Sequence, residues 1–202
     1  MGETPLSRER VLAAAEEVLR RHGVGKANVV DVAQVLGVSH ASVYRHFPSK
    51  AALRGAVLQG WLARVSEPLR EIAAAPAPAP ERLRAWLIAL RRAKRAKVRD
   101  DPELFAAYAA LAAEAREVIA GHVEELLGQL AGLIAEGIRR GELGGKRAQA
   151  RDLALAIFDA TSRFHHPAMA YLWDRPGEDA AFEQLLGLLL AGLAPRASHR
   201  KH

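Results

Sequence analysis

Hydrophobic residues recur at intervals of three and four along most of the chain, the spacing that gives an α-helix one buried face. No segment shows the alternation of apolar and polar residues that marks a β-strand. Alanine is abundant and aromatic residues are few, which favours closely packed helices. The sequence therefore predicts an all-α fold of about nine helices. They are expected over residues 7–21, 28–36, 40–46, 50–73, 81–98, 101–111, 114–140, 147–164 and 179–193.

Near the N-terminus, two of the predicted helices are short and are joined by a tight turn. Asn28 and Ser39 are good N-cap residues, because their side-chain oxygens can accept free backbone N–H groups. Gly37 between the helices can adopt the positive φ that such a turn needs. The second helix turns only Val43 and Phe47 inward. This pattern is typical of a helix-turn-helix, whose second helix enters a DNA groove.

The outer face of this second helix is polar but not acidic. Its residues are donors, small groups and one phenol: His40, Ala41, Ser42, Tyr44, Arg45 and His46. Such a face suits base edges and phosphates. The plainer interpretation is an ordinary pair of helices with a solvated face. The coincidence of Ala33, Gly37 and Val43 with the polar face favours DNA binding.

Three motifs near the N-terminus resemble those of a known family: Asp31-Val-Ala, Leu36-Gly-Val-Ser and Tyr44-Arg-His-Phe-Pro-Ser-Lys-Ala-Ala-Leu53. The run from Gly23 to Leu53 that holds them resembles the DNA-binding domain of the TetR family of bacterial transcriptional regulators. The resemblance implies a three-helix module with a helix-turn-helix at residues 1–50. A larger helical domain for effector binding and dimerisation is expected at 51–195. Residues 196–202 are expected to form a disordered basic tail.

The resemblance also assigns DNA-binding roles, in which residues hold phosphates, face bases or support backbone contacts. Tyr44 and Lys50 are expected to hold phosphates, while His40, Ala41, Arg45 and His46 face the bases. Asn28 and Ser42 are expected to support backbone contacts, and Ser39 is a further expected DNA-binding residue. The base-facing residues are expected to set which operator sequence is read.

In the resembled family a small molecule binds among the fifth to eighth helices. The expected lining is Trp86, Leu90, Phe105, Tyr108, Leu111, His122, Phe164 and His165. A plain core would contain the same residue types, so this interpretation has an ordinary alternative. The implied function is a repressor that a small-molecule effector releases from DNA.

The last predicted helix, residues 179–193, has a wide apolar face that needs a cover. The resemblance implies that the last two helices pair with their copies in a second subunit. A two-fold homodimer requires a near-palindromic operator of double-stranded DNA, with half-sites about 34 Å apart.

Composition adds little to this interpretation but limits its rivals. The net charge of +6 and the pI near 10 suit a polyanionic partner. Cysteine is absent, which excludes disulfides and thiolate metal sites. The N-terminus is not a signal peptide, and the most apolar run, residues 185–194, is too short to cross a bilayer. A cytoplasmic protein without membrane contact is expected.

Other functions have weaker support in the sequence. An enzyme is not expected, because no catalytic motif is complete; Gly23-Val-Gly-Lys26 lacks most of a phosphate loop. Cofactors are not expected either, although a divalent metal at His122, His165 or His166 would make a metal-responsive regulator. A ligand-independent, architectural DNA-binding protein is the remaining alternative.

Two further segments carry predictions about their surroundings. Residues 73–80, rich in alanine and proline, are expected to form a stiff, extended surface connector. The helix at 81–98 ends in a basic cluster: Arg91, Arg92, Lys94, Arg95, Lys97 and Arg99. We expect it to be solvated, or, from the family fold, to contact flanking phosphates.

Overall fold

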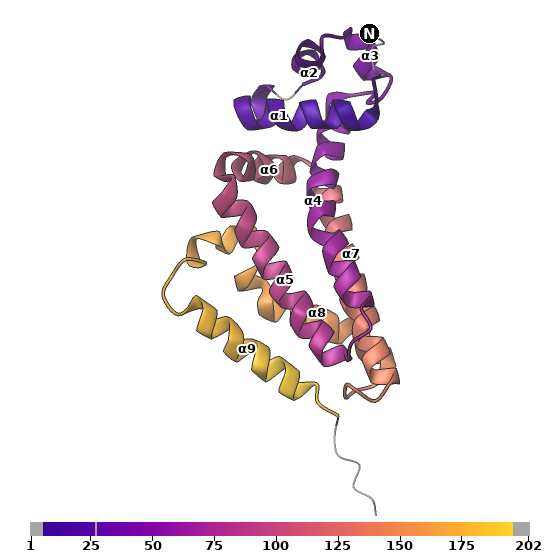
Figure 1. The fold of residues 1–202 in the computed structure, drawn as a ribbon, viewed down its shortest axis with the longest axis vertical. Helices are drawn as coiled ribbons and strands as arrows, with labels where there is room; N and C mark the ends of the chain where they lie inside the picture. Colours follow the sequence, from indigo (N-terminus) through magenta and orange to yellow (C-terminus); the bar gives the residue numbers. More distant parts are fainter. Residues whose placement is uncertain (1–5, 27, 196–202) are drawn as a thin grey trace, which may run out of the picture. The chain divides into compact units, whose positions relative to one another are not determined.

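The computed structural model describes residues 6–26 and 28–195. Within these ranges the regular elements are all helical, so the predicted all-α class is confirmed. In chain order (Figure 1) they are α1 Arg8–Lys26, α2 Val29–Leu36, α3 His40–Tyr44, α4 Lys50–Ala74, α5 Ala79–Asp100, α6 Pro102–Glu114, α7 Arg116–Arg139, η1 Arg147–Gln149, α8 Ala150–Thr161, η2 Ser162–Phe164, η3 Pro167–Leu172 and α9 Glu178–Gly192. The predicted tail at 196–202 lies outside the described residues.

The chain forms two compact units. The first unit comprises the chain up to Arg64 together with Arg99–His122, and the second comprises Val65–Val98 and the chain from Val123 onward. Helices α4, α5 and α7 therefore each contribute to both units. Helix α6 falls in the first unit with the N-terminal helices, and the predicted domain bounds stay a prediction.

Helix α1 organises the core of the first unit, where it packs against α2 and α6. Its inner stripe is almost fully buried: Val11, Ala15, Val18 and Leu19. Gly23, with φ 70° and ψ −178°, interrupts the helix near the predicted end. On the other side of the unit, the Trp61 ring of α4 stacks on the Tyr108 ring of α6, with centroids 4.3 Å apart. The apolar spacing of the sequence thus produces this core as predicted.

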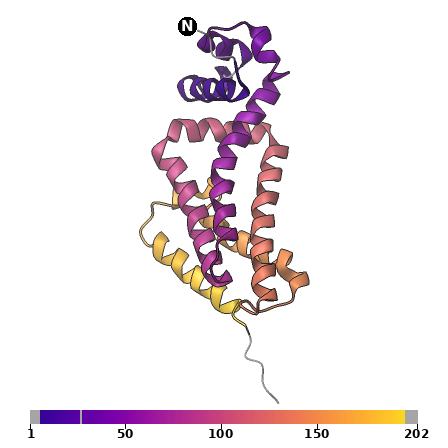
Figure 2. The same cartoon turned by 45° about the vertical axis from the view of Figure 1, so that its right-hand side comes forward.

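Helix α5 supplies much of the core of the second unit. Leu83, Trp86 and Leu90 are fully buried, and they belong to one cluster with residues of α7 and α9. The Trp86 indole donates to Gln129 Oε1 at 3.1 Å, and Gln129 Nε2 donates to the Ser66 carbonyl at 3.0 Å. Figure 2 shows α5 beside α9, as does Figure 1. A polar chain therefore links α4, α5 and α7 inside an apolar core.

The prediction of an extended connector over 73–80 is wrong at both ends. Helix α4 continues to Ala74, and α5 already begins at Ala79, which is fully buried. Proline fits the first turn of a helix, because its missing N–H would have no helical partner there. The Ala79 N–H instead donates to Glu142 Oε2 at 2.7 Å. Gly137 leaves room for this start, since a Cβ there would lie 2.6 Å from the Ala79 methyl.

Helix α7 is, within the described ranges, the one helix long and apolar enough to cross a membrane by length and composition. Its residues Leu126, Leu130 and Ile134 are buried in the core of the second unit. Core helices of globular domains meet the same criterion. About a third of the apolar window of α7 (33%) is buried inside the structure.

Candidate nucleic-acid interface

The turn between α2 and α3 is built by local hydrogen bonds. Asn28 Oδ1 accepts the Val30 and Asp31 N–H groups at 2.8 and 3.1 Å, which caps α2. Gly37 adopts φ 64° and ψ 31°, the left-handed conformation that glycine tolerates best. The next N–H, of Val38, donates to the Ala33 carbonyl at 3.0 Å. The predicted tight turn after α2 is therefore present.

Helix α3 is short and is held from one side. Ser39 Oγ accepts the Ser42 N–H at 3.2 Å and caps the helix. Val43 and Phe47 are 0 % and 1 % exposed and insert into the core of the first unit. The helix ends at Tyr44, two residues earlier than predicted, and the chain continues in a turn through Arg45 and His46. Two apolar anchors thus fix the helix while the rest of its surface is left open.

The predicted outer face is on the surface. His40, Ala41, Tyr44 and Arg45 are exposed, and Ser42 and His46 are partly exposed. Arg45 Nη2 donates to Ser42 Oγ at 3.3 Å, and this hydroxyl also lies 2.9 Å from Ser39 Oγ. The side chains of the two serines thus hold the start of the helix and orient the guanidinium. The face offers hydrogen-bond donors without a carboxylate, the arrangement that suits duplex DNA.

Lys50 opens α4 and is exposed. Ser49 Oγ caps this helix by accepting the Ala52 N–H at 3.0 Å. A cation at a helix N-terminus is opposed by the helix dipole, whereas an anion bound there is favoured by both the dipole and the ammonium. The position therefore suits a phosphate oxygen.

The sequence did not indicate the role of Arg8, which contacts the turn after α3. Its Nη1 donates to the His46 carbonyl at 3.1 Å, and its guanidinium lies 4.2 Å from the centre of the Phe47 ring. The contact adds to the backbone bond from the Phe47 N–H to the Val43 carbonyl, 3.0 Å long, and closes the turn that follows α3. Arg8 and His46 are 38 residues apart, so no local sequence pattern indicates that they interact.

The predicted effector-lining residues fall into two groups. The first unit contains Phe105, Tyr108, Leu111 and His122; the second contains Trp86, Leu90, Phe164 and His165. All are buried except Phe105, which is half-buried. Burial raises the pKa of the Tyr108 phenol well above its ordinary value. The residues are therefore core residues of two units, and their role towards a ligand stays a prediction.

The adjacent histidines of the second unit have different surroundings. His165 is 5 % exposed, and its Nε2 lies 3.3 Å from the Phe158 carbonyl oxygen and 3.3 Å from Thr161 Oγ1. His166 is exposed, and its Nδ1 accepts the Ala168 N–H at 3.2 Å as the N-cap of η3. Within the described residues no group of three or more potential metal ligands occurs. Each ring thus has a hydrogen-bonding role within the fold.

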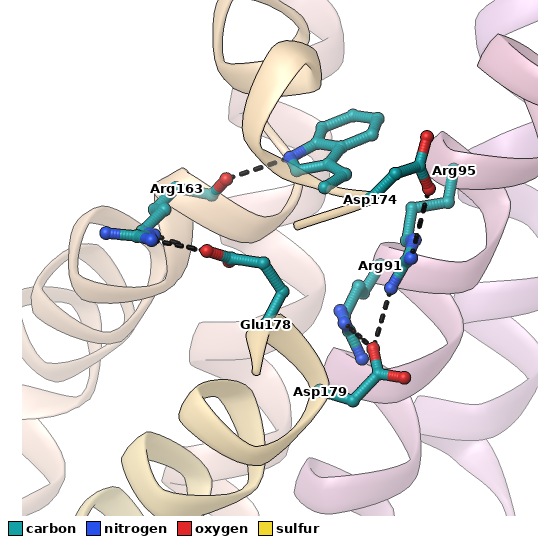
Figure 3. Close-up of polar contacts among 7 residues, drawn as sticks. Arg91, Arg95, Arg163, Asp174, Glu178 and Asp179 are labelled. Carbon is teal, nitrogen blue, oxygen red and sulfur yellow. Dashed lines mark hydrogen bonds and ion pairs between the residues drawn. The ribbon is translucent and has the colours of Figure 1, made fainter. Parts of the chain in front are cut away.

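The basic end of α5 is largely turned into the second unit, so the prediction of a solvated or phosphate-binding cluster is wrong for its inner members. Figure 3 shows Arg91 and Arg95 directed at Asp179, at the start of α9. Arg95 Nη1 lies 2.8 Å from Asp179 Oδ1, and Nη2 lies 3.4 Å from Asp174 Oδ1. Lys94 between them is 8 % exposed. These cations hold α9 or lie in the core.

The same part of the second unit contains another close pair. Arg163 and Glu178 are joined by two hydrogen bonds, one of them 3.4 Å long from Nε to Oε2, and Glu178 is 5 % exposed. The Trp173 indole donates to the Arg163 carbonyl at 2.9 Å. The hydrogen bond and charge of Arg163 lower the pKa of Glu178. The beginning of α9 is therefore tied to both α5 and the segment after α8.

These features define a class of all-helical proteins. Its members combine an exposed, cationic helix-turn-helix with a larger helical body. A family model described as "Bacterial regulatory proteins, tetR family" matches residues 11–57, and one described as "Tetracyclin repressor-like, C-terminal domain" matches residues 79–186. The second alone covers more than half of the chain. The chain therefore belongs to the TetR family of bacterial transcriptional regulators.

A relative found by sequence matches this chain over about a third of its own length, whereas solved structures match nearly the whole chain. The chain is 33% identical over 76 residues to the HTH-type transcriptional regulator TtgR of Pseudomonas putida, and the match spans 35% of this chain and 36% of that protein. A TetR/AcrR regulator from Thermobifida fusca has 23% identity and a TM-score of 0.62, covering 96% of this chain and 98% of its own. BioQ, solved with its double-stranded DNA operator, has 22% identity and a TM-score of 0.54, covering 92% and 99%. The two structures establish likeness of fold.

Proposed function

We propose that this protein is a cytoplasmic transcriptional repressor that binds a near-palindromic operator and is released from it by a small-molecule effector. The observation that carries the proposal is the outer face of α3, which is exposed, rich in donors and free of carboxylates. Val43 and Phe47 support it from beneath. A regulator is preferred to an enzyme because operator binding needs only this exposed face on two copies of the chain.

The proposed contacts divide by chemistry. Tyr44 and Lys50 hold phosphates, as their exposure at the ends of α3 and the start of α4 allows. Base edges face His40, Ala41, Arg45 and His46, while Asn28, Ser39 and Ser42 support the backbone contacts. A guanidinium can donate two parallel hydrogen bonds to guanine, so Arg45 is the residue best suited to sequence readout.

A homodimer is supported by the outward surface of the last two helices. Leu155 on α8 and Leu188 on α9 are 46% and 72% exposed. One exposed face of α9 also carries small residues that allow close helix approach: Ala180, Gly187 and Ala191. Two copies joined by a two-fold axis would cover these apolar residues and place two α3 helices about 34 Å apart on DNA.

Effector response requires a ligand that prefers the conformation with the wrong spacing of recognition helices. A ligand that binds both conformations equally would leave operator affinity unchanged. The buried residues of the second unit are where we propose that the ligand binds.

The test is to incubate the purified full chain with fragments of its own genome and to sequence those it retains. Fluorescence anisotropy then compares the best fragment with a scrambled duplex of equal length. We expect tight binding of a near-palindrome, with an affinity at least about 1,000-fold above the scrambled control at physiological salt. A ratio near one would identify an architectural DNA-binding protein instead and would refute the proposed repressor.

A further inference from the structure

Lys94 occupies a position that the helical pattern reserves for an apolar residue. Leu83, Leu87, Leu90 and Lys94 follow one another at intervals of four, three and four along α5, which places them on one face. All four are buried, and Lys94 is 8 % exposed. Lysine is almost never fully buried without a partner of opposite charge. The buried face of α5 therefore ends in a cation.

The neighbouring cations of α5 have acidic partners and Lys94 has none. Arg91 and Arg95 both pair with Asp179 (Figure 3). Among the described residues, Lys94 makes neither an ion pair nor a hydrogen bond, although it lies on the same helix between these arginines. The charge of Lys94 is costly, because little water reaches a side chain that is 8 % exposed and no acidic group replaces that water. A bound anion would offset this cost.

The titratable groups that act on Lys94 cannot neutralise it. Burial, and then the charge of Lys97, lower the pKa of Lys94 to about 8, so the ammonium is still the main form at neutral pH. His165 feels the charge of Lys94, and its own pKa is lowered to about 4, chiefly by burial. Its Nε2 faces the Phe158 carbonyl, which can only accept, so Nε2 carries the ring proton and the ring is neutral. No titratable group that acts on Lys94 therefore balances its positive charge.

We propose that Lys94 binds the carboxylate of a small, otherwise apolar effector in the second unit. This inference rests on the proposed effector response and names the chemical class of the effector. A single ammonium beside a neutral imidazole matches a monoanion, whereas a phosphate monoester would bring more negative charge than the site balances. The buried Leu90, one turn before Lys94, and Phe164, next to His165, suit a hydrocarbon body. The carboxylate replaces the missing acidic side chain.

The test uses two pairs of probes that differ only in charge: octanoate with octanamide, and 1-naphthoate with 1-naphthamide. The octanoate pair tests an aliphatic carboxylate as the effector, and the 1-naphthoate pair tests an aromatic one. Calorimetric titration of the full chain measures the affinity of each probe for the wild type, for Lys94→Met and for Lys146→Met. The last variant removes an exposed lysine of the same unit and controls for net charge.

We expect the wild type and Lys146→Met to bind at least one carboxylate about 10- to 100-fold more tightly than its amide, the range for a hydrogen bond to a charged group. In Lys94→Met this preference should disappear. NMR titration of the wild type gives a second readout: the bound carboxylate should raise the pKa of both Lys94 and His165, because it cancels the excess positive charge. This readout needs no variant, and Lys94→Gln replaces Lys94→Met should the latter fail to fold.

Three results would overturn the inference: no preference for a carboxylate in either pair, a preference that survives in Lys94→Met, or a Lys94 pKa that no probe changes. Operator affinity is measured separately by anisotropy. Loss of the carboxylate effect with intact operator binding would remove the inference and leave the repressor. Carboxylate binding through Lys94 in a protein without a preferred operator would support the binding of a carboxylate and refute the repressor.

Discussion

Two segments of this chain carry basic residues in sequence and have opposite surroundings in the structure. The segment around α3 shows Arg45 and Lys50 to solvent, and no carboxylate pairs with either among the described residues. The end of α5 turns Arg91 and Arg95 onto Asp179 and buries Lys94. The difference teaches that clustered positive charge alone does not identify a DNA-binding surface. The free energy of each cation depends on what the fold brings opposite to it.

The largest effect is expected where the α5 arginines meet the core. Phe182 is 2 % exposed, packs edge-on against Phe164, and lies under the Arg91 guanidinium, 4.6 Å from its ring centre. Phe182→Ala should lower the free energy of unfolding by about 3–5 kcal/mol, since it leaves a cavity in the core. Urea denaturation followed by circular dichroism measures this loss. The exposed Tyr44→Ala is the matched control, and an equal loss there would contradict the contrast between the segments.

Lys94→Met should have the opposite sign. The pKa of Lys94 is about 8 in the fold and about 10.5 when the chain is unfolded. The difference corresponds to about 3 kcal/mol of unfolding free energy gained by the variant at pH 7. Between these two values the unfolded chain holds more protons, so the wild type gains stability as the pH rises and the advantage of the variant shrinks. Thermal unfolding from pH 7 to 10.5 checks both the gain and its loss; a destabilised Lys94→Met at pH 7 would show that Lys94 is favourably paired.

On the other segment, Arg45→Ala should change recognition rather than stability. We expect the variant to lose about 1–3 kcal/mol of discrimination between operator and altered sequences, because base contacts specify. Its free energy of unfolding should change by less than about 0.5 kcal/mol, as for other surface sites. Lys50→Ala is the comparison: it should weaken all duplexes alike and reduce the salt slope by about one. Equal loss on operator and scrambled DNA for Arg45→Ala would contradict its role in base readout.

The smallest effect is expected for Asp179→Asn. The hydrogen bonds from Arg91 and Arg95 lower the pKa of Asp179, but its side chain is 79% exposed and solvent screens the pairs. Such pairs contribute about 0.2–1 kcal/mol. That contribution is present above the ordinary pKa of the carboxyl and is lost as the pH falls, so wild type and variant should converge in acid. A difference in denaturation midpoint that persists once acid has protonated Asp179 in the folded protein would mean that the pair is not its source.

The accuracy of the sequence predictions depended on how far apart the interacting residues lie. The caps by Asn28, Ser39 and Ser49 join groups two or three residues apart, and Gly37 acts through its own φ. The helix-turn-helix and its outer face were predictable for that reason. The contact of Arg95 with Asp179 spans 84 residues, and no local spacing indicates it.

The segment 73–80 shows the same dependence on distant residues, here through a backbone hydrogen bond. The run of prolines was correctly expected to end a helix, but Ala79 begins the next one because Glu142 accepts its N–H and Gly137 makes room. Both partners come from a distant part of the chain. The predicted effector-lining residues are mostly buried, and their division between two units followed from packing.

By itself, the sequence determined the helical class, the turn before α3, the inward Val43 and Phe47, and the resemblance to the family, because these depend on periodicity and on contacts within a few residues. Only the tertiary structure decided that Arg8 closes the turn after α3, that two arginines of α5 hold α9, and that Lys94 is buried without an acid. Charge, unlike helical periodicity, has no local preference for its partner. Its role is set by the dielectric and the groups that folding places around it.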